Sequence, residues 1–140
     1  MEPSRTRTRL LLVLLLVMMQ PRLSRAYVGT AASYSPPYTP TACYGNDPGQ
    51  FPSSNLFAAA GEGIWDNGAS CGRQYLVNCT SALGSGFCIP NQTIQVQIVD
   101  RVLFLSSRPS CDDTTIVLSM TAFDTIAKFA SAVNIMYQQV

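Results

Sequence analysis

The sequence predicts a mainly β domain, a small closed barrel of short strands with one short helix near the C-terminus. Two patterns carry this prediction. Residues 93–99 (TIQVQIV) alternate apolar and polar side chains, which is the period of a half-buried strand. Residues 119–130 (SMTAFDTIAKFA) place apolar side chains three and four positions apart, behind a serine suited to cap a helix. Many short strands favour a barrel, because closure hides the strand edges.

Shorter signals place the other elements. Asp66-Asn67-Gly68 predicts a tight turn, because asparagine and glycine adopt positive φ at low cost. Residues 46–54 contain asparagine, aspartate, glycine and two prolines and predict a loop, whereas residues 56–60 (LFAAA) are too few to distinguish a buried strand from a helical turn. Four further segments predict strands from their β-compatible or alternating residues: 27–34, 73–77, 114–118 and 133–140.

The N-terminus has the layout of a secretory signal peptide. Three arginines in residues 1–9 precede the apolar run 10–19, and a small-x-small cleavage motif follows at residues 24–26. The apolar run is shorter than the roughly 20 residues that a membrane-spanning helix needs. We therefore expect residues 1–26 to be removed, with a retained N-terminal anchor as the alternative, and residues 27–140 to form one mature domain.

Charge and composition narrow the classes of function. The mature chain keeps four basic and seven acidic residues, a net charge of −3, which does not favour a nucleic-acid partner. The sequence has no histidine, which excludes Ser-His-Asp and Cys-His catalysis and zinc sites that contain histidine. The five cysteines lack the paired C-x-x-C spacing of a four-cysteine zinc site, so in a secreted chain we expect disulfides and neither a metal nor a cofactor.

Several motifs occur in a characteristic order along the mature chain. The most specific are ACYG at residues 42–45, the pattern W-x-N-G-x-x-C-G-R at residues 65–73, and VDR at residues 99–101. With these motifs, residues 27–140 resemble the plant natriuretic peptides and the wider expansin-like group, whose domain is similar to family-45 endoglucanases. The resemblance implies a six-stranded double-psi β-barrel in a protein secreted to the plant apoplast.

The resemblance also implies how the cysteines pair. It matches Cys43 with Cys71 and Cys79 with Cys88, whereas four cysteines alone allow three pairings. Many relatives carry a third pair, one cysteine of which falls where this chain has Val102. Cys111 is therefore expected to be unpaired. It is a free thiol, a cysteine that bridges two molecules, or an inert cysteine with no role, and we favour the last.

Catalysis is not expected. Two carboxylates suffice to hydrolyse a glycosidic bond without histidine. In the resembling hydrolases and many expansins, one acid lies in a His-Phe-Asp-Leu motif, and the matching position here is Val117. The other hydrolase carboxylate lies near the first cysteine, where this chain has Tyr44 and Gly45. The resemblance thus implies no catalytic residues and no lytic activity.

Four residues are candidate contacts to a polysaccharide. Asp100 ends the clearest strand and matches an aspartate on the expansin binding surface, and the rings of Trp65, Tyr34 and Tyr44 are candidates to stack on sugars. Each has a structural alternative. Asp100 is equally suited to bind backbone N–H groups or an arginine at the strand end, and Trp65 is better suited to the core, because aromatic side chains in small domains are mostly buried.

Two sequons predict N-glycosylation. Asn91-Gln92-Thr93 follows a proline in an expected exposed loop, which makes Asn91 the better acceptor. Asn78-Cys79-Thr80 requires modification of Asn78 before Cys79 is buried in its disulfide. A chance occurrence is the alternative for each sequon.

The resemblance implies a secreted, non-enzymatic protein of the plant natriuretic type. Such a protein regulates water and ion balance through a cell-surface receptor, with the activity carried by a segment that maps to residues 38–73. The alternative is a non-lytic, expansin-like module that binds cell-wall polysaccharide, and the third possibility is a residual endoglucanase. The first two interpretations expect a monomer in the apoplast or cell wall, without membrane insertion after signal cleavage.

Overall fold

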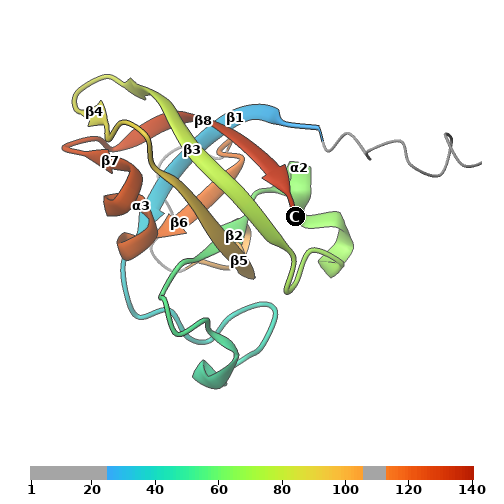
Figure 1. The fold of residues 1–140 in the computed structure, drawn as a ribbon. Helices are drawn as coiled ribbons and strands as arrows, with labels where there is room; N and C mark the ends of the chain where they lie inside the picture. The colour runs from blue at the N-terminus through green and yellow to red at the C-terminus, as the bar shows by residue number, and fades with distance from the viewer. Residues whose placement is uncertain (1–24, 106–112) are drawn as a thin grey trace, which may run out of the picture.

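Six strands of the computed structural model pair edge to edge into a closed barrel (Figure 1). The structure describes residues 25–105 and 113–140. Each strand pairs with two others, and β8 closes the ring by pairing with both β3 and β1. Around the barrel the order is β1 (Tyr27–Tyr34), β6 (Ile116–Ser119), β2 (Phe57–Ala60), β5 (Thr93–Arg101), β3 (Gln74–Leu83) and β8 (Ala132–Gln139). The predicted mainly β barrel is confirmed.

Two of the six pairings are parallel. Strand β1 runs parallel to β6, and β2 runs parallel to β5, whereas the other four pairings are antiparallel. A parallel pairing cannot be joined by a tight hairpin, so the chain must cross over the barrel between the paired strands. The result is the six-stranded double-psi β-barrel that the resemblance implies.

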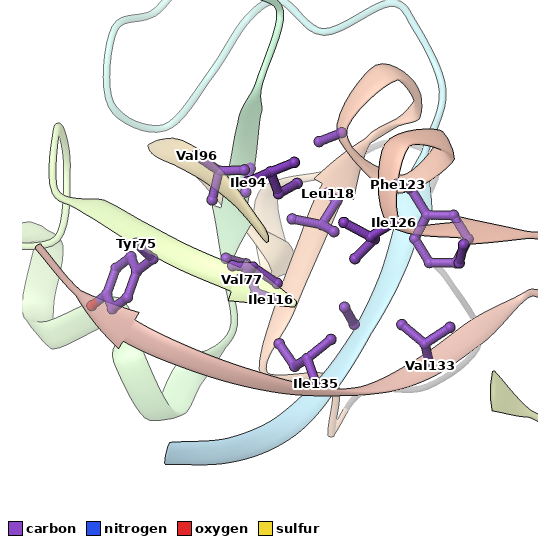
Figure 2. Packing of buried hydrophobic residues seen from close by; sticks show 14 of the residues in the cluster. Tyr75, Val77, Ile94, Val96, Ile116, Leu118, Phe123, Ile126, Val133 and Ile135 are labelled. Atoms are coloured by element: carbon purple, nitrogen blue, oxygen red, sulfur yellow. The ribbon is translucent and has the colours of Figure 1, made fainter. Parts of the chain in front are cut away.

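The barrel interior is filled by branched aliphatic side chains (Figure 2). In β5, Ile94, Val96 and Ile98 are buried while Gln95 is exposed, as the alternating sequence predicts. Helix α3 (Met120–Ile126) covers one end of this core with Phe123 and Ile126. Burying each such side chain contributes about 1.5–3 kcal/mol to folding.

Helix α3 begins as predicted and ends earlier than predicted. The Ser119 hydroxyl accepts a 3.2 Å hydrogen bond from the backbone N–H of Ala122, which caps the helix. The helical pattern that we extended to Ala130 stops at Ile126, because the chain then pairs as β7 (Ala127–Lys128) with β4 (Phe87–Cys88). Pairing with a distant strand thus overrides the local helical periodicity.

The remaining short elements follow the turn chemistry of the sequence. Residues 56–60 contain strand β2, which is fully buried between β5 and β6. Two short helical segments, α2 (Glu62–Trp65) and η2 (Asp66–Gly68), connect β2 to β3, and all three residues of η2 have positive φ. Two further 3-10 turns are η1 (Pro48–Gln50) and η3 (Val102–Phe104).

Two disulfides join the chain as the resemblance implies. The Cys43–Cys71 bridge ties the loop after β1 to the turn before β3, and the Cys79–Cys88 bridge ties β3 to β4. Cys111 and nearly all of the expected signal peptide lie outside the described residues. Within residues 25–105 and 113–140, no helix has the length and apolar character needed to cross a membrane.

Candidate functional site

Asp100 is buried at the C-terminal end of β5, with 2% of its surface exposed. Its Oδ1 accepts hydrogen bonds from the backbone N–H groups of Ala42 at 2.9 Å and Arg101 at 2.8 Å. Burial raises the pKa of this carboxyl, and the two hydrogen bonds oppose part of that increase. The structure therefore gives Asp100 the backbone-binding role that we weighed from the sequence, and its carboxylate also faces a cavity.

The cavity beside Asp100 has a volume of about 140 Å³. Aromatic rings, prolines and a leucine form most of its wall, which is lined by Tyr34, Pro37, Tyr38, Thr39, Pro40, Asp100, Phe104 and Leu105. The Tyr38 hydroxyl donates to the carbonyl oxygen of Tyr34 at 3.2 Å and accepts from the N–H of Met120 at 3.2 Å. These bonds fix one aromatic wall of the cavity.

Tyr34 brings a second buried polar group to the same cavity. Its side chain is 3% exposed, and its hydroxyl has no hydrogen-bond partner within the described part of the chain. Burial raises the pKa of Tyr34 strongly, and the nearby charge of Asp100 adds to the effect. The Tyr34 ring is buried and makes edge-to-face contacts with Tyr38 and Phe57, so the structure does not present it as an exposed stacking platform.

Val117, the residue that the resemblance matches to the hydrolase acid, lies in the same row of the barrel as Asp100. Ala59 of β2 pairs with Val117 on one side and with Asp100 on the other. Two strand spacings place the Cα atoms of Val117 and Asp100 about 10 Å apart. In inverting glycosidases the two carboxyl groups are about 6.5–9.5 Å apart. An acid at position 117 would thus lie at roughly that distance from Asp100. The valine is instead fully buried in a cluster with Val99.

Trp65 and Tyr44 lie apart from one another. Tyr44 is half-buried against the cluster that contains Tyr34, and its backbone N–H donates to Thr41 Oγ1 at 2.8 Å. Trp65 packs partly against the barrel core, and the guanidinium of Arg101 lies 5.6 Å from the centre of its ring. The structure thus brings Tyr34 and Asp100 together, with Tyr44 near them, and places Trp65 on a different wall.

That wall belongs to a second hollow, of about 420 Å³, which the sequence analysis did not predict. Arg101 donates through Nε and Nη2 to the two carboxylate oxygens of Glu62, each at 2.8 Å. Arg73 donates through Nη2 to Asp66 at 2.8 Å. The bond from Arg101 lowers the pKa of Glu62. Glu62 and Arg101 are 39 residues apart, and no local pattern indicates that they meet.

The two sequons differ in their surroundings. Asn91 is exposed in the turn between β4 and β5, at a φ of 59°. Asn78 is half-buried inside β3, where it pairs with Thr93 and Met136 on the flanking strands. Access to the side chain therefore favours Asn91 as the glycosylation site. Across the described ranges, no three histidine, cysteine, aspartate or glutamate side chains are grouped to hold a metal.

The six-stranded double-psi β-barrel agrees with the expansin-like class that the sequence resembles. A family model described as lytic transglycolase matches residues 57–137. An EG45-like domain containing protein of Citrus jambhiri is 40% identical over 110 residues, which cover 74% of this chain and 75% of that protein. The chain therefore belongs to the EG45-like family of double-psi β-barrel proteins.

Other relatives agree with this assignment. EG45-like domain containing protein 2 of Arabidopsis thaliana is 34% identical over 79 residues, which cover 56% of this chain and 57% of that protein. The structure of an expansin from Clavibacter michiganensis superposes with a TM-score of 0.59 at 21% identity, and a mutant of it in complex with cellohexaose gives 0.60. The match covers 83% of this chain and half of that expansin, and it shows a common fold.

Proposed function

We propose that this protein is a secreted, non-cleaving binder of a cell-wall polysaccharide, and that the cavity beside Asp100 holds one sugar unit. The observation that carries the proposal is the pairing of two buried polar groups, the Tyr34 hydroxyl and the Asp100 carboxylate, at one cavity. Buried polar groups are nearly always hydrogen-bonded, yet the Tyr34 hydroxyl has no partner within the described residues. A ligand hydroxyl would supply that partner.

Sugar hydroxyls have the right chemistry for this pair. A hydroxyl donates one hydrogen bond and accepts two. Because Asp100 Oδ1 already accepts two backbone N–H groups, a sugar hydroxyl would donate to Oδ2 while it accepts from Tyr34. The rings of Tyr38 and Phe104 offer apolar surface to the C–H groups of the sugar ring.

The size of the cavity favours one unit of a longer chain. Complete ligand pockets have volumes of about 300–1,000 Å³, and this cavity has about 140 Å³. The expansin that was solved with cellohexaose has the same fold, which makes a β-linked glucan the first ligand to test.

Binding without cleavage follows from the carboxylates of the cavity. Most glycosidases use a pair of carboxylates, and Asp100 is the only one that lines this cavity among the described residues. Val117 replaces the second acid with a buried aliphatic side chain. The two disulfides and the expected signal peptide at residues 1–26 support secretion to the apoplast.

The test is a pull-down of the purified 27–140 protein on insoluble cellulose and wall glucans, with released sugar assayed in the same tubes. The Tyr34→Phe variant removes only a hydroxyl without a described partner, so it should fold normally and lose retention. Tyr27→Phe is the matched control, because Tyr27 is exposed and does not line the cavity. Equal retention of both variants contradicts the proposed site, and released sugar contradicts binding without cleavage.

A second candidate function is receptor-mediated control of water and ion balance. The observation that favours it is the loop of residues 42–55, which extends away from the barrel and is largely exposed (Figure 1). A receptor ligand would act through this loop and would be indifferent to the Asp100 cavity. Protoplast volume assays with Tyr34→Phe, and with residues 46–50 replaced by a Gly-Ser sequence, separate the two functions. Swelling lost only in the loop variant favours signalling.

A further inference from the structure

We infer that the hollow lined by Trp65 and Arg101 is a second saccharide-binding site, specific for a neutral oligosaccharide. The inference rests on the proposed function for the class of ligand and adds a site that is independent of the Asp100 cavity. The hollow has a volume of about 420 Å³. Small-molecule pockets have volumes of about 300–1,000 Å³, so the hollow is large enough for such a ligand. Its walls come from α2, η2, the start of β3 and the end of β5.

Charged side chains are concentrated in this hollow. Residues 27–105 and 113–140 contain three basic side chains, and two of them, Arg73 and Arg101, line the hollow. Each is bonded to a carboxylate, Asp66 or Glu62, whose side chain is at least half exposed. Exposed ion pairs contribute little to stability. Folding energy therefore does not account for two such pairs in one hollow.

The paired charges suit an uncharged ligand that carries many hydroxyls. A guanidinium has five N–H donors, and Arg101 uses Nε and Nη2 for Glu62, which leaves the two N–H groups of Nη1 outside this pair. The carboxylates of Glu62 and Asp66 retain acceptor capacity beyond the bonds to their arginines. Strong donors and acceptors held side by side match the alternating demands of adjacent sugar hydroxyls.

The same charges disfavour an acidic polysaccharide. The two carboxylates balance the two guanidinium groups within the hollow. The mature chain as a whole has a net charge of −3, which repels a polyanion. A uronic-acid polymer would have to displace Glu62 or Asp66 against this field, whereas a neutral glucan would not.

A tight turn at the wall of the hollow fixes the position of two polar side chains. Asp66 and Asn67 have φ values of 54° and 51°, in the left-handed region that L-residues seldom adopt. Gly68 follows at 92°, so three successive residues share this conformation. This turn holds Asp66 and Asn67 on the hollow wall.

The two sites lie on opposite sides of β5. Asp100 and Arg101 are consecutive residues of this strand, and successive side chains of a strand point to opposite faces. Asp100 lines the smaller cavity and Arg101 lines the hollow. Loss of one site should therefore leave the other intact.

The experiment is an NMR titration of the mature protein with cellohexaose, which reads out both sites separately. Arg73→Met should reduce affinity at the hollow by about tenfold or more, the loss expected for a charge-assisted hydrogen bond. In that variant, shift changes of the α2 and η2 amides should disappear while those around Asp100 persist. Lys128→Met removes the same charge outside the hollow and should leave both responses unchanged.

The outcomes separate this inference from the proposed function. If cellohexaose shifts the amide signals around Asp100 but none in α2 and η2, the second site is overturned and the proposed function remains in place. Responses in α2 and η2 that persist in Tyr34→Phe support the second site even if the Asp100 cavity does not bind. Tighter binding of an oligogalacturonate than of cellohexaose overturns the assignment of a neutral ligand, and no response in either region overturns both proposals.

Discussion

The carboxylate of Asp100 accepts a 2.9 Å hydrogen bond from the backbone N–H of Ala42, which lies 58 residues earlier in the chain. This bond fastens the loop after β1 to the end of β5. A second bond, from the N–H of Arg101 to the same oxygen, fixes the orientation of the carboxylate. Asp100 is therefore part of the frame of the cavity as well as part of its polar surface.

We expect Asp100→Ala to lower the free energy of unfolding by about 2–4 kcal/mol, because it leaves two N–H groups without their acceptor. Asp100→Asn retains one side-chain oxygen and should cost about 1 kcal/mol. Urea denaturation of the two variants and the wild type measures both changes. A smaller loss for alanine than for asparagine would show that the two hydrogen bonds do not stabilise the fold.

The pKa of Asp100 predicts how stability depends on pH. Its folded-state pKa is raised above the usual 3.8 by burial, so the folded protein binds this proton more tightly than the unfolded chain. The resulting stabilisation is complete below pH 3.8 and is lost as pH rises through the folded-state pKa. The stability of the wild type relative to Asp100→Asn should therefore fall as pH rises above 3.8.

Urea denaturation of the wild type and Asp100→Asn in matched buffers of increasing pH tests whether the stability difference falls with pH. The comparison with Asp100→Asn cancels contributions from other groups such as Glu62, whose lowered pKa acts in the opposite direction. A wild-type advantage that grows with pH contradicts the raised pKa of Asp100.

The two disulfides should differ in their contribution to stability. They close loops with sequence separations of 28 residues for Cys43–Cys71 and 9 residues for Cys79–Cys88. In the loop-entropy model the longer bridge contributes about 3.6 kcal/mol and the shorter one about 2.7 kcal/mol. Double serine variants of each pair, compared by thermal and urea unfolding, measure the difference. An equal loss in both variants would show that loop length does not set the effect.

Gly61 and Gly63 give a matched pair of substitutions beside the hollow. A Cβ at Gly61 would overlap the carbonyl oxygen of Thr114, whereas a Cβ at Gly63 has no heavy atom within 4 Å. Gly61→Ala should therefore cost about 1–3 kcal/mol through overpacking. Gly63→Ala should gain about 0.5–1 kcal/mol, because alanine favours the helical conformation of α2. A stable Gly61→Ala protein would contradict the close approach of α2 to Thr114.

Local patterns predicted those elements whose burial alternates along a single strand. In β5 the buried face of Ile94, Val96 and Ile98 is visible in the sequence because each side chain meets the same core. The end of α3 was not predictable in this way, since Ala127 leaves the helix to pair with Cys88. A preference that depends on a partner 39 residues away leaves no local signal.

Only part of the candidate site could be predicted from the sequence, because some of its contacts also depend on distant partners. Asp100 was identifiable because it ends a clear strand and matches a family motif. The burial of Tyr34 depends on contacts with Tyr38 and Phe57, which are brought together by the barrel. The pairing of Glu62 with Arg101 depends on the parallel alignment of β2 and β5. Long-range pairings of this kind set the geometry of a site, and a linear pattern does not encode them.

The loop of residues 42–55 is fastened to the barrel at both ends. Asp100 holds the N–H of Ala42, and the Ser119 hydroxyl donates to the carbonyl oxygen of Asn55 at 2.7 Å. Between these anchor points the residues of η1 contribute nothing to the buried core. The barrel therefore offers a ready insertion point at η1, where a peptide epitope or a fluorescent tag replaces residues 48–50 while both anchors, the Cys43–Cys71 bridge and the strand pairings stay in place.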